Sequence, residues 1–104
     1  MSDPFPTTRE ATILAILASG ELYGREIRNQ YRKLGGGVMP LGSLYTTLAR
    51  MEHKGYVSSR MGDSLHERGG NRRKYFRIRA AGAAALDAYQ ARASGLLRLE
   101  LDRA

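Results

Sequence analysis

The spacing of the apolar residues changes twice along this chain, and these changes limit the fold more than any other feature. Apolar residues recur at three- to four-residue spacing up to about residue 55 and again after residue 79, which is typical of helices that bury one face. Between these parts, Tyr56–Met61 and Lys74–Ile78 are short segments that favour strands, and turn-forming residues separate them. The sequence therefore predicts three helices, an antiparallel hairpin and a terminal helix, an α+β fold that is mostly helical.

The first two helices have recognisable ends. Thr7 and Glu10 have the spacing of a capping box, in which each side chain accepts a hydrogen bond from the backbone of the other residue. This motif predicts a first helix over residues 8–19. Apolar and aromatic residues at helical spacing predict a second helix over residues 23–33, which Gly35–Gly37 would end.

The third predicted helix begins at Ser43, whose hydroxyl can cap it, and ends at Gly55. Leu44, Leu48 and Met51 form its apolar stripe, and no acidic residue occurs before its last turn. Such a surface can approach DNA without repulsion between like charges, although an ordinary solvated helix would have a similar pattern. The residues on its other faces are Ser43, Tyr45, Thr46, Thr47, Arg50 and Lys54.

The positive charge is concentrated in one part of the chain. The formal net charge is +7, and residues 50–79 hold nine basic residues against three acidic ones, so this segment carries +6 of it. Arg68, Arg72, Arg73 and Lys74 flank a Gly-Gly-Asn turn between the predicted strands. These cations suit a wing that follows a phosphate backbone or enters the minor groove. The alternatives are a solvated charged surface and a simple turn.

The terminal helix is predicted over residues 80–102, with a length of roughly 30 Å. A single domain of 104 residues has too small a core to cover a helix of this length. The apolar stripe is therefore expected to pack against a second copy of the chain, although packing within its own core is the alternative. The stripe consists of Leu86, Tyr89, Ala93, Leu96, Leu97 and Leu101.

Several classes of function are excluded by composition. The chain has no cysteine and two histidines, so it cannot form a disulfide, a thiolate zinc site or a three-histidine metal site. His53 and His66 have acidic neighbours, but no nucleophile motif or phosphate-binding loop accompanies them. We therefore expect no enzyme activity, no catalytic residue, no metal and no cofactor. No apolar segment approaches the roughly 20 residues that span a bilayer, and no signal peptide is visible, so we expect a cytoplasmic protein with no membrane partner.

Three segments of the sequence together resemble the PadR family of bacterial winged-helix transcriptional repressors. They are Leu22–Ile27 (LYGREI), Gly42–Glu52 (GSLYTTLARME) followed by Gly55, and Arg73–Ile78 (RKYFRI) followed by Ala81-Gly82. The resemblance extends over about residues 11–86 and depends on the order and spacing of all three segments. Thr46 departs from the family pattern, which has a proline after the tyrosine of the third helix.

The resemblance implies a winged helix-turn-helix over residues 1–79 and a dimerisation helix over residues 80–104 in the same compact unit. It also implies a homodimer that represses transcription from a pseudo-palindromic operator on double-stranded DNA, with release by a small-molecule effector in many members. A regulator that needs no ligand and acts through a protein partner is the alternative. The positions that the resemblance places at DNA are Tyr23, Ser43, Tyr45 and Arg50, with Arg72, Arg73 and Lys74 on the wing.

Overall fold

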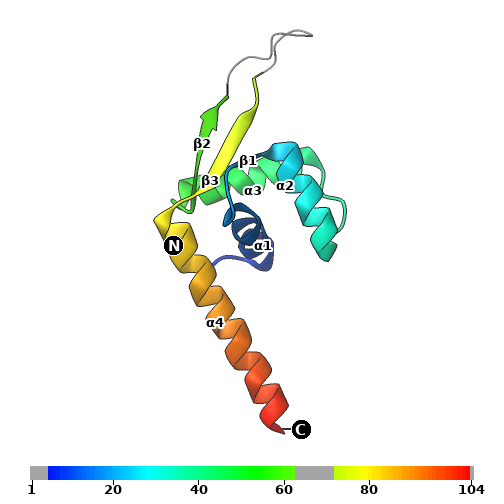
Figure 1. Ribbon diagram of the computed structural model, residues 1–104, viewed down its shortest axis with the longest axis vertical. Helices are drawn as coiled ribbons and strands as arrows, with labels where there is room; N and C mark the ends of the chain where they lie inside the picture. The colour runs from blue at the N-terminus through cyan, green and yellow to red at the C-terminus, as the bar shows by residue number, and fades with distance from the viewer. Residues whose placement is uncertain (1–4, 63–71, 104) are drawn as a thin grey trace.

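The computed structural model describes residues 5–62 and 72–103 of the chain (Figure 1). The observed order confirms the predicted succession of three helices, hairpin and terminal helix, and it adds a short strand before the second helix. The elements are α1 (Thr8–Leu17), β1 (Leu22–Tyr23), α2 (Gly24–Tyr31), the π-helical turn η1 (Arg32–Gly36), α3 (Leu41–His53), β2 (Val57–Met61), β3 (Lys74–Ile78) and α4 (Ala80–Arg103).

Strand β3 is the centre of an antiparallel sheet with the order β1-β3-β2. Phe76 in β3 pairs with Leu22 of β1 on one side and with Ser59 of β2 on the other. The Phe76 side chain is buried in the core. Because successive side chains point to opposite faces of a strand, Tyr75 and Arg77 lie on the outer face. The predicted alternation is confirmed, and the predicted two-stranded wing is part of a three-stranded sheet.

The hydrophobic core lies between the inner face of this sheet and the helices. Leu44, Leu48 and Met51 of α3 are fully buried in it, which confirms the predicted apolar stripe. Each such side chain contributes about 1.5–3 kcal/mol by leaving water. The same core therefore fixes the position of α3 relative to the sheet.

The capping box at the start of α1 is confirmed. The Thr7 hydroxyl accepts a hydrogen bond from the Glu10 backbone N–H at 3.1 Å, and the Glu10 carboxylate accepts one from the Thr7 N–H at 2.9 Å. The helix ends at Leu17, two residues before the predicted end.

The second helix is shorter than the predicted span of residues 23–33. Tyr23 is paired with Tyr75 in the sheet and is extended, so α2 begins only at Gly24. After Tyr31 the helix widens into the π-helical turn η1. Gly35 and Gly37 have φ values of +87° and +81° at the end of this turn, a conformation that glycine adopts without strain. The predicted role of the glycine-rich segment is thus confirmed.

Helix α3 begins at Leu41, before the predicted start at Ser43. The prediction that Ser43 caps the helix is wrong, because the Leu44 N–H already donates to the Pro40 carbonyl at 3.1 Å. Ser43 is an exposed residue of the first turn instead. Gly55 follows the last turn with a φ of +81°, as predicted.

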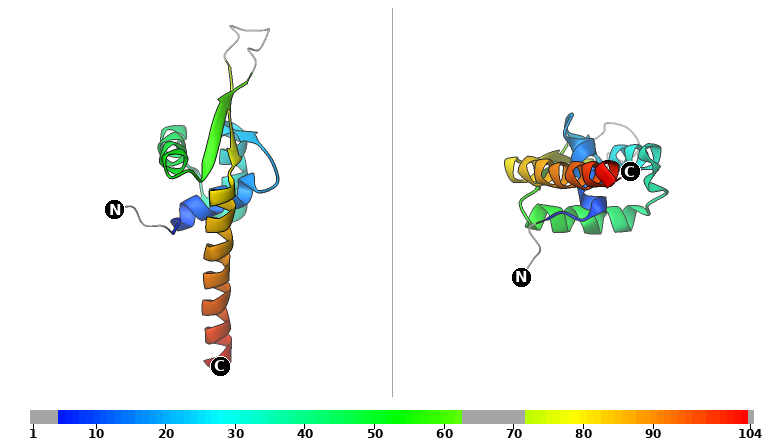
Figure 2. Two further views of the ribbon diagram at one scale, coloured as in Figure 1. Left: turned by 90° about the vertical axis from the view of Figure 1, so that its left-hand side faces the viewer. Right: turned by 90° about the horizontal axis from the view of Figure 1, so that it is seen from below.

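Helix α4 spans Ala80–Arg103 and confirms the predicted terminal helix. It leaves the rest of the protein at the end opposite to the wing (Figures 1 and 2). At its start, Gly82 lies against the Tyr56 carbonyl, where a Cβ atom would collide with the backbone. Side chains at residues 90–102 are all exposed, so only the first part of α4 belongs to the core.

A buried ion pair joins the first turn of α1 to the end of α3. The Glu10 side chain is fully buried, and the Lys54 ammonium donates to both of its carboxylate oxygens at 3.1 Å. Glu10 also accepts the capping hydrogen bond from Thr7. A buried carboxylate needs such partners because it has lost its hydration.

We predict that Lys54→Met lowers the free energy of unfolding by about 3 kcal/mol, because it leaves Glu10 buried without its cation. Urea denaturation at fixed protein concentration measures the change. Lys33→Met is the matched control, since Lys33 is exposed in η1, and it should change stability by less than about 0.5 kcal/mol. Equal losses in the two variants would contradict this role of the ion pair.

Candidate nucleic-acid interface

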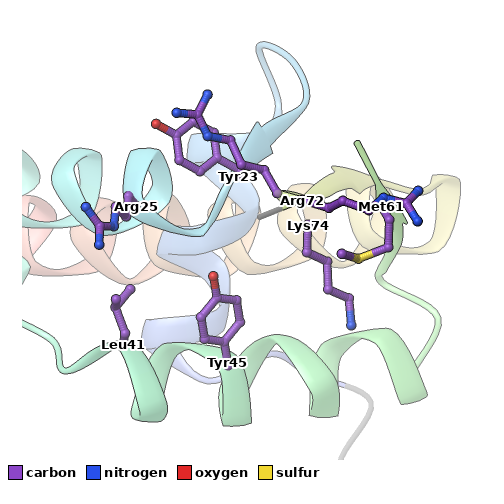
Figure 3. Close-up of a pocket in the computed structure, with 8 residues that line it drawn as sticks. Tyr23, Arg25, Leu41, Tyr45, Met61, Arg72 and Lys74 are labelled. Atoms are coloured by element: carbon purple, nitrogen blue, oxygen red, sulfur yellow. The ribbon is translucent and has the colours of Figure 1, made fainter. Parts of the chain in front are cut away.

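A groove of about 500 Å³ lies between the start of α2, the first turns of α3 and the base of the wing (Figure 3). Four of its lining residues are basic and none of the lining residues is acidic. Such a groove is suited to a polyanion that contacts the helix and the wing together. The lining residues are Tyr23, Arg25, Leu41, Tyr45, Met61, Arg72, Arg73 and Lys74.

Helix α3 forms one wall of the groove, and most of its predicted polar residues reach the surface. Ser43, Thr46 and Arg50 are exposed. The Thr46 hydroxyl donates to the Gly42 carbonyl at 2.9 Å, so its proton is already used and its oxygen remains as an acceptor.

Tyr45 is 41% exposed and bridges two helices. Its hydroxyl is directed from α3 towards α2 (Figure 3), where it lies against Gly24 so closely that a Cβ atom at that residue would collide with it. Its ring is tilted against Phe76, with 6.3 Å between the ring centroids. Tyr45 thus contributes both to the groove surface and to the packing of α3 against α2.

Thr47 differs from its predicted place on the exposed surface of this helix. Its side chain is 4% exposed, and its hydroxyl donates to the Ser43 carbonyl at 2.9 Å. Thr47 lies between the buried residues Leu44 and Leu48 along the helix, so its side chain turns towards the core. We therefore leave Thr47 out of the surface that can contact a ligand.

The base of the wing forms the other wall. Arg72, Arg73 and Lys74 are all exposed. The Arg72 guanidinium donates to the Gly62 carbonyl at 2.8 Å, and the Gly62 N–H donates to the Arg73 carbonyl at 2.7 Å. These bonds hold the two ends of the wing together. The predicted tip residues Arg68 and Gly69-Gly70-Asn71 lie outside the described residues.

Aromatic rings and guanidinium groups are stacked across the outer face of the sheet. The Tyr23 and Tyr75 rings meet edge to face at 5.7 Å, Arg73 lies over Tyr23 at 4.5 Å, and Arg60 lies over Tyr75 at 4.8 Å. Arg60 also donates to the Glu21 carboxylate through its Nε at 2.9 Å. Sequence reasoning missed this stack, because a two-residue strand is too short to recognise by alternation.

The groove cations and the acidic residues of the domain are separated. Among the described residues, the two salt bridges are Lys54–Glu10 and Arg60–Glu21, and neither involves a groove cation. The Glu26 carboxylate accepts from the Tyr23 N–H at 3.1 Å. No carboxylate of the described residues therefore neutralises Arg25, Arg72, Arg73 or Lys74.

The predicted dimerisation stripe divides into two parts. Leu86 is 8% exposed in the core of its own chain, and the Tyr89 hydroxyl is 2.9 Å from the Thr8 hydroxyl of α1. These two residues are thus packed within the chain, which corrects the prediction for Leu86. The other four predicted residues of the stripe are exposed, and so is Leu99, which sequence reasoning missed. The exposed residues are Ala93, Leu96, Leu97, Leu99 and Leu101.

No group of three or more histidine, cysteine or acidic side chains in residues 5–62 and 72–103 could hold a metal ion. Within the same residues, no helix is both long enough and apolar enough to cross a membrane. His66 lies outside the described part of the chain.

Three helices, a three-stranded sheet with a basic hairpin, and the groove between them define a winged helix-turn-helix protein. The model of the PadR-like family of transcriptional regulators matches residues 13–88, and the chain belongs to this family. The family is one of DNA-binding regulators, so the prediction that the chain is not an enzyme is confirmed. Comparison with curated protein sequences gives no match.

Solved structures are similar to this chain over most of its length. A PadR family transcription regulator from Clostridium difficile R20291 is 27% identical with a TM-score of 0.74, and the match covers 89% of this chain and 94% of that one. A transcriptional regulator from Clostridium thermocellum is also 27% identical, with a TM-score of 0.69 and coverage of 90% and 89%. Bacillus subtilis PadR in complex with operator DNA is 20% identical with a TM-score of 0.68. This match covers 80% of the present chain and 46% of the Bacillus subtilis chain.

The Glu21–Arg60 pair gives a prediction about pH. Hydrogen bonds from Arg60 lower the pKa of Glu21 below its usual value of 4.5; desolvation opposes this shift, and the charges of Arg60 and Arg77 add to it. A carboxyl group whose pKa is lowered by folding stabilises the protein above its unfolded pKa, and this stability is lost as the pH falls through the folded pKa. We therefore expect the wild type to lose more stability than Glu21→Gln on acidification below about pH 4.5.

Urea denaturation between pH 6 and pH 3 measures this difference. Glu100→Gln, at an exposed position of α4, is the control and should follow the wild type. If Glu21→Gln lost as much stability on acidification as the wild type, the ion pair would have no effect on stability.

Proposed function

We propose that the chain binds operator DNA as a homodimer and represses transcription. The observation that carries this proposal is the basic groove, whose cations have no carboxylate partner among the described residues and which adjoins the exposed face of α3. A site with this charge suits the DNA backbone. A cytoplasmic location follows from such a role.

Helix α3 is the proposed recognition helix, which enters the major groove. Ser43, Tyr45 and Thr46 lie in its first half, where the partial positive charge of the helix N-terminus favours phosphate. Arg50, about two turns after Ser43, reaches a guanine edge or a phosphate. The wing residues Arg72, Arg73 and Lys74 contact the neighbouring backbone or minor groove, and Tyr23 lies between the two elements.

The exposed leucines of α4 support a homodimer. Leu96, Leu97 and Leu101 are 57%, 62% and 67% exposed in the single chain. Several exposed leucines on one helix are typical of a surface that a partner chain covers. Two copies related by a twofold axis would place their α3 helices about 34 Å apart, in successive major grooves of a pseudo-palindromic site. Bacillus subtilis PadR, which has this fold, has been solved with its operator DNA.

Control by a small molecule is the finer part of the proposal. A pocket of about 170 Å³ lies between the N-terminal segment and α4, and Phe5, Tyr89, Arg92 and Leu96 are among its lining residues. An apolar pocket with one cation suits an aromatic acid. The alternative is a regulator that acts through a protein partner, which would bind the same DNA but would not respond to any small molecule.

We predict that replacing Arg72, Arg73 and Lys74 together by alanine weakens binding to all duplex sequences. Each lost phosphate contact reduces the slope of log K against log salt concentration by about 0.9. Fluorescence anisotropy with a non-specific duplex over a series of KCl concentrations measures both effects. The control replaces Arg28, Arg32 and Lys33 of α2 and η1 and removes the same charge away from the groove. Equal slopes for the wing variant and the wild type would refute the wing assignment.

We predict that Leu97→Asp breaks the dimer, because the interface would bury an unpaired charge. Sedimentation velocity at low micromolar concentration should then give a monomer. Ala88→Asp is the matched control, since Ala88 is exposed nine residues earlier and therefore lies on the opposite side of the helix. A Leu97→Asp variant that sediments as a dimer would contradict the assignment of this face.

A further inference from the structure

Tyr23 occupies an unusual position between the helical part of the domain and the wing. It is the last residue of β1, it directly precedes α2, and its side chain is half-buried. One face of its ring carries the Arg73 guanidinium, 4.5 Å from the centroid. The same ring meets Tyr75 edge to face at 5.7 Å and 68°.

The position of the Tyr23 ring is set from two directions. Its backbone pairs with Tyr75 in the sheet, and its N–H donates to the Glu26 carboxylate of α2 at 3.1 Å. Tyr75 is confined in turn, because Gly62 lies so close to its ring that a Cβ atom would collide with it. Arg60 covers Tyr75 at 4.8 Å. The ring beneath Arg73 is therefore a fixed support.

The three wing cations differ in what holds them. Arg72 donates to the Gly62 carbonyl, and the Lys74 ammonium lies 5.7 Å from the Phe76 centroid on the groove side. Arg73 is exposed, and among the described residues the Tyr23 ring is the group over which its guanidinium lies. A stacked guanidinium keeps its N–H donors free at the edge of its plane, where they can bind phosphate in a bidentate manner.

We propose that Tyr23 is a positioning residue for DNA binding, which acts by holding the Arg73 guanidinium in the orientation that binds phosphate. This inference depends on the proposed function of the groove. This role differs from a direct contact between Tyr23 and DNA, because the aromatic face of Tyr23 supports the Arg73 guanidinium and the Tyr23 hydroxyl is dispensable. The support reduces the conformational freedom that the arginine side chain loses on binding.

The experiment measures binding of the full chain to a non-specific duplex by fluorescence anisotropy at several KCl concentrations. Tyr23→Phe keeps the ring and should lose far less affinity than Tyr23→Leu. Tyr23→Leu should weaken binding about two- to fivefold, the factor that an exposed cation–π contact supplies. Arg73→Ala also removes the phosphate contact and should weaken binding at least as much. The double variant should lose no more than Arg73→Ala alone. Tyr31→Leu is the control, because it removes another half-buried tyrosine ring, from the end of α2, and should leave the affinity and the salt slope unchanged.

Arg73→Lys tests the same inference without altering Tyr23. Lysine keeps the charge but loses the planar stacking, so it should weaken binding more in the wild type than in Tyr23→Leu. If Tyr23→Phe lost as much affinity as Tyr23→Leu, the hydroxyl would be a direct contact and the inference would be overturned. Additive losses from Tyr23→Leu and Arg73→Ala would also overturn it. A wild-type chain that bound no duplex at all would instead refute the proposed function.

Discussion

The pairing of β3 with strands on both of its sides is the constraint on which the rest of this structure depends. Phe76 pairs with Leu22 towards α2 and with Ser59 towards the wing, and its buried ring contacts Tyr45 of α3. One residue thus connects the start of α2, the proposed recognition helix and the wing. Strand β1 adds backbone pairing between the start of α2 and the hairpin, so Tyr23 lies at a fixed position relative to the wing.

The charged residues are arranged to keep this groove basic. Glu10 and Glu21 are bound to Lys54 and Arg60, and neither lines the groove. The buried Glu10–Lys54 pair also joins α1 to the end of α3. These two carboxylates therefore stabilise the fold, whereas the cations at the groove remain available to an anionic partner. Such a surface is consistent with the family to which the chain belongs, which consists of transcriptional regulators.

The sequence predicted the elements well where apolar residues repeat at regular spacing. It predicted them less well where a residue's position depends on contacts with residues distant in sequence. The stripe of Leu44, Leu48 and Met51 is fully buried as expected. Thr47 was misplaced because the buried sector of α3 is wider than its apolar stripe, and Leu86 was misplaced because α1 covers the first part of α4. The stack of Tyr23 on Arg73 needs the register of β1 against β3, which two residues of strand do not reveal.

The most direct test of this account is to follow the backbone amide resonances of the protein while a duplex DNA is added. We predict that the largest shifts among the described residues occur at Ser43–Arg50 of α3 and Arg72–Lys74 of the wing, with none on the exposed turns of α4. Shifts concentrated at Arg28 and Arg32, which form a basic surface away from the groove, would contradict it.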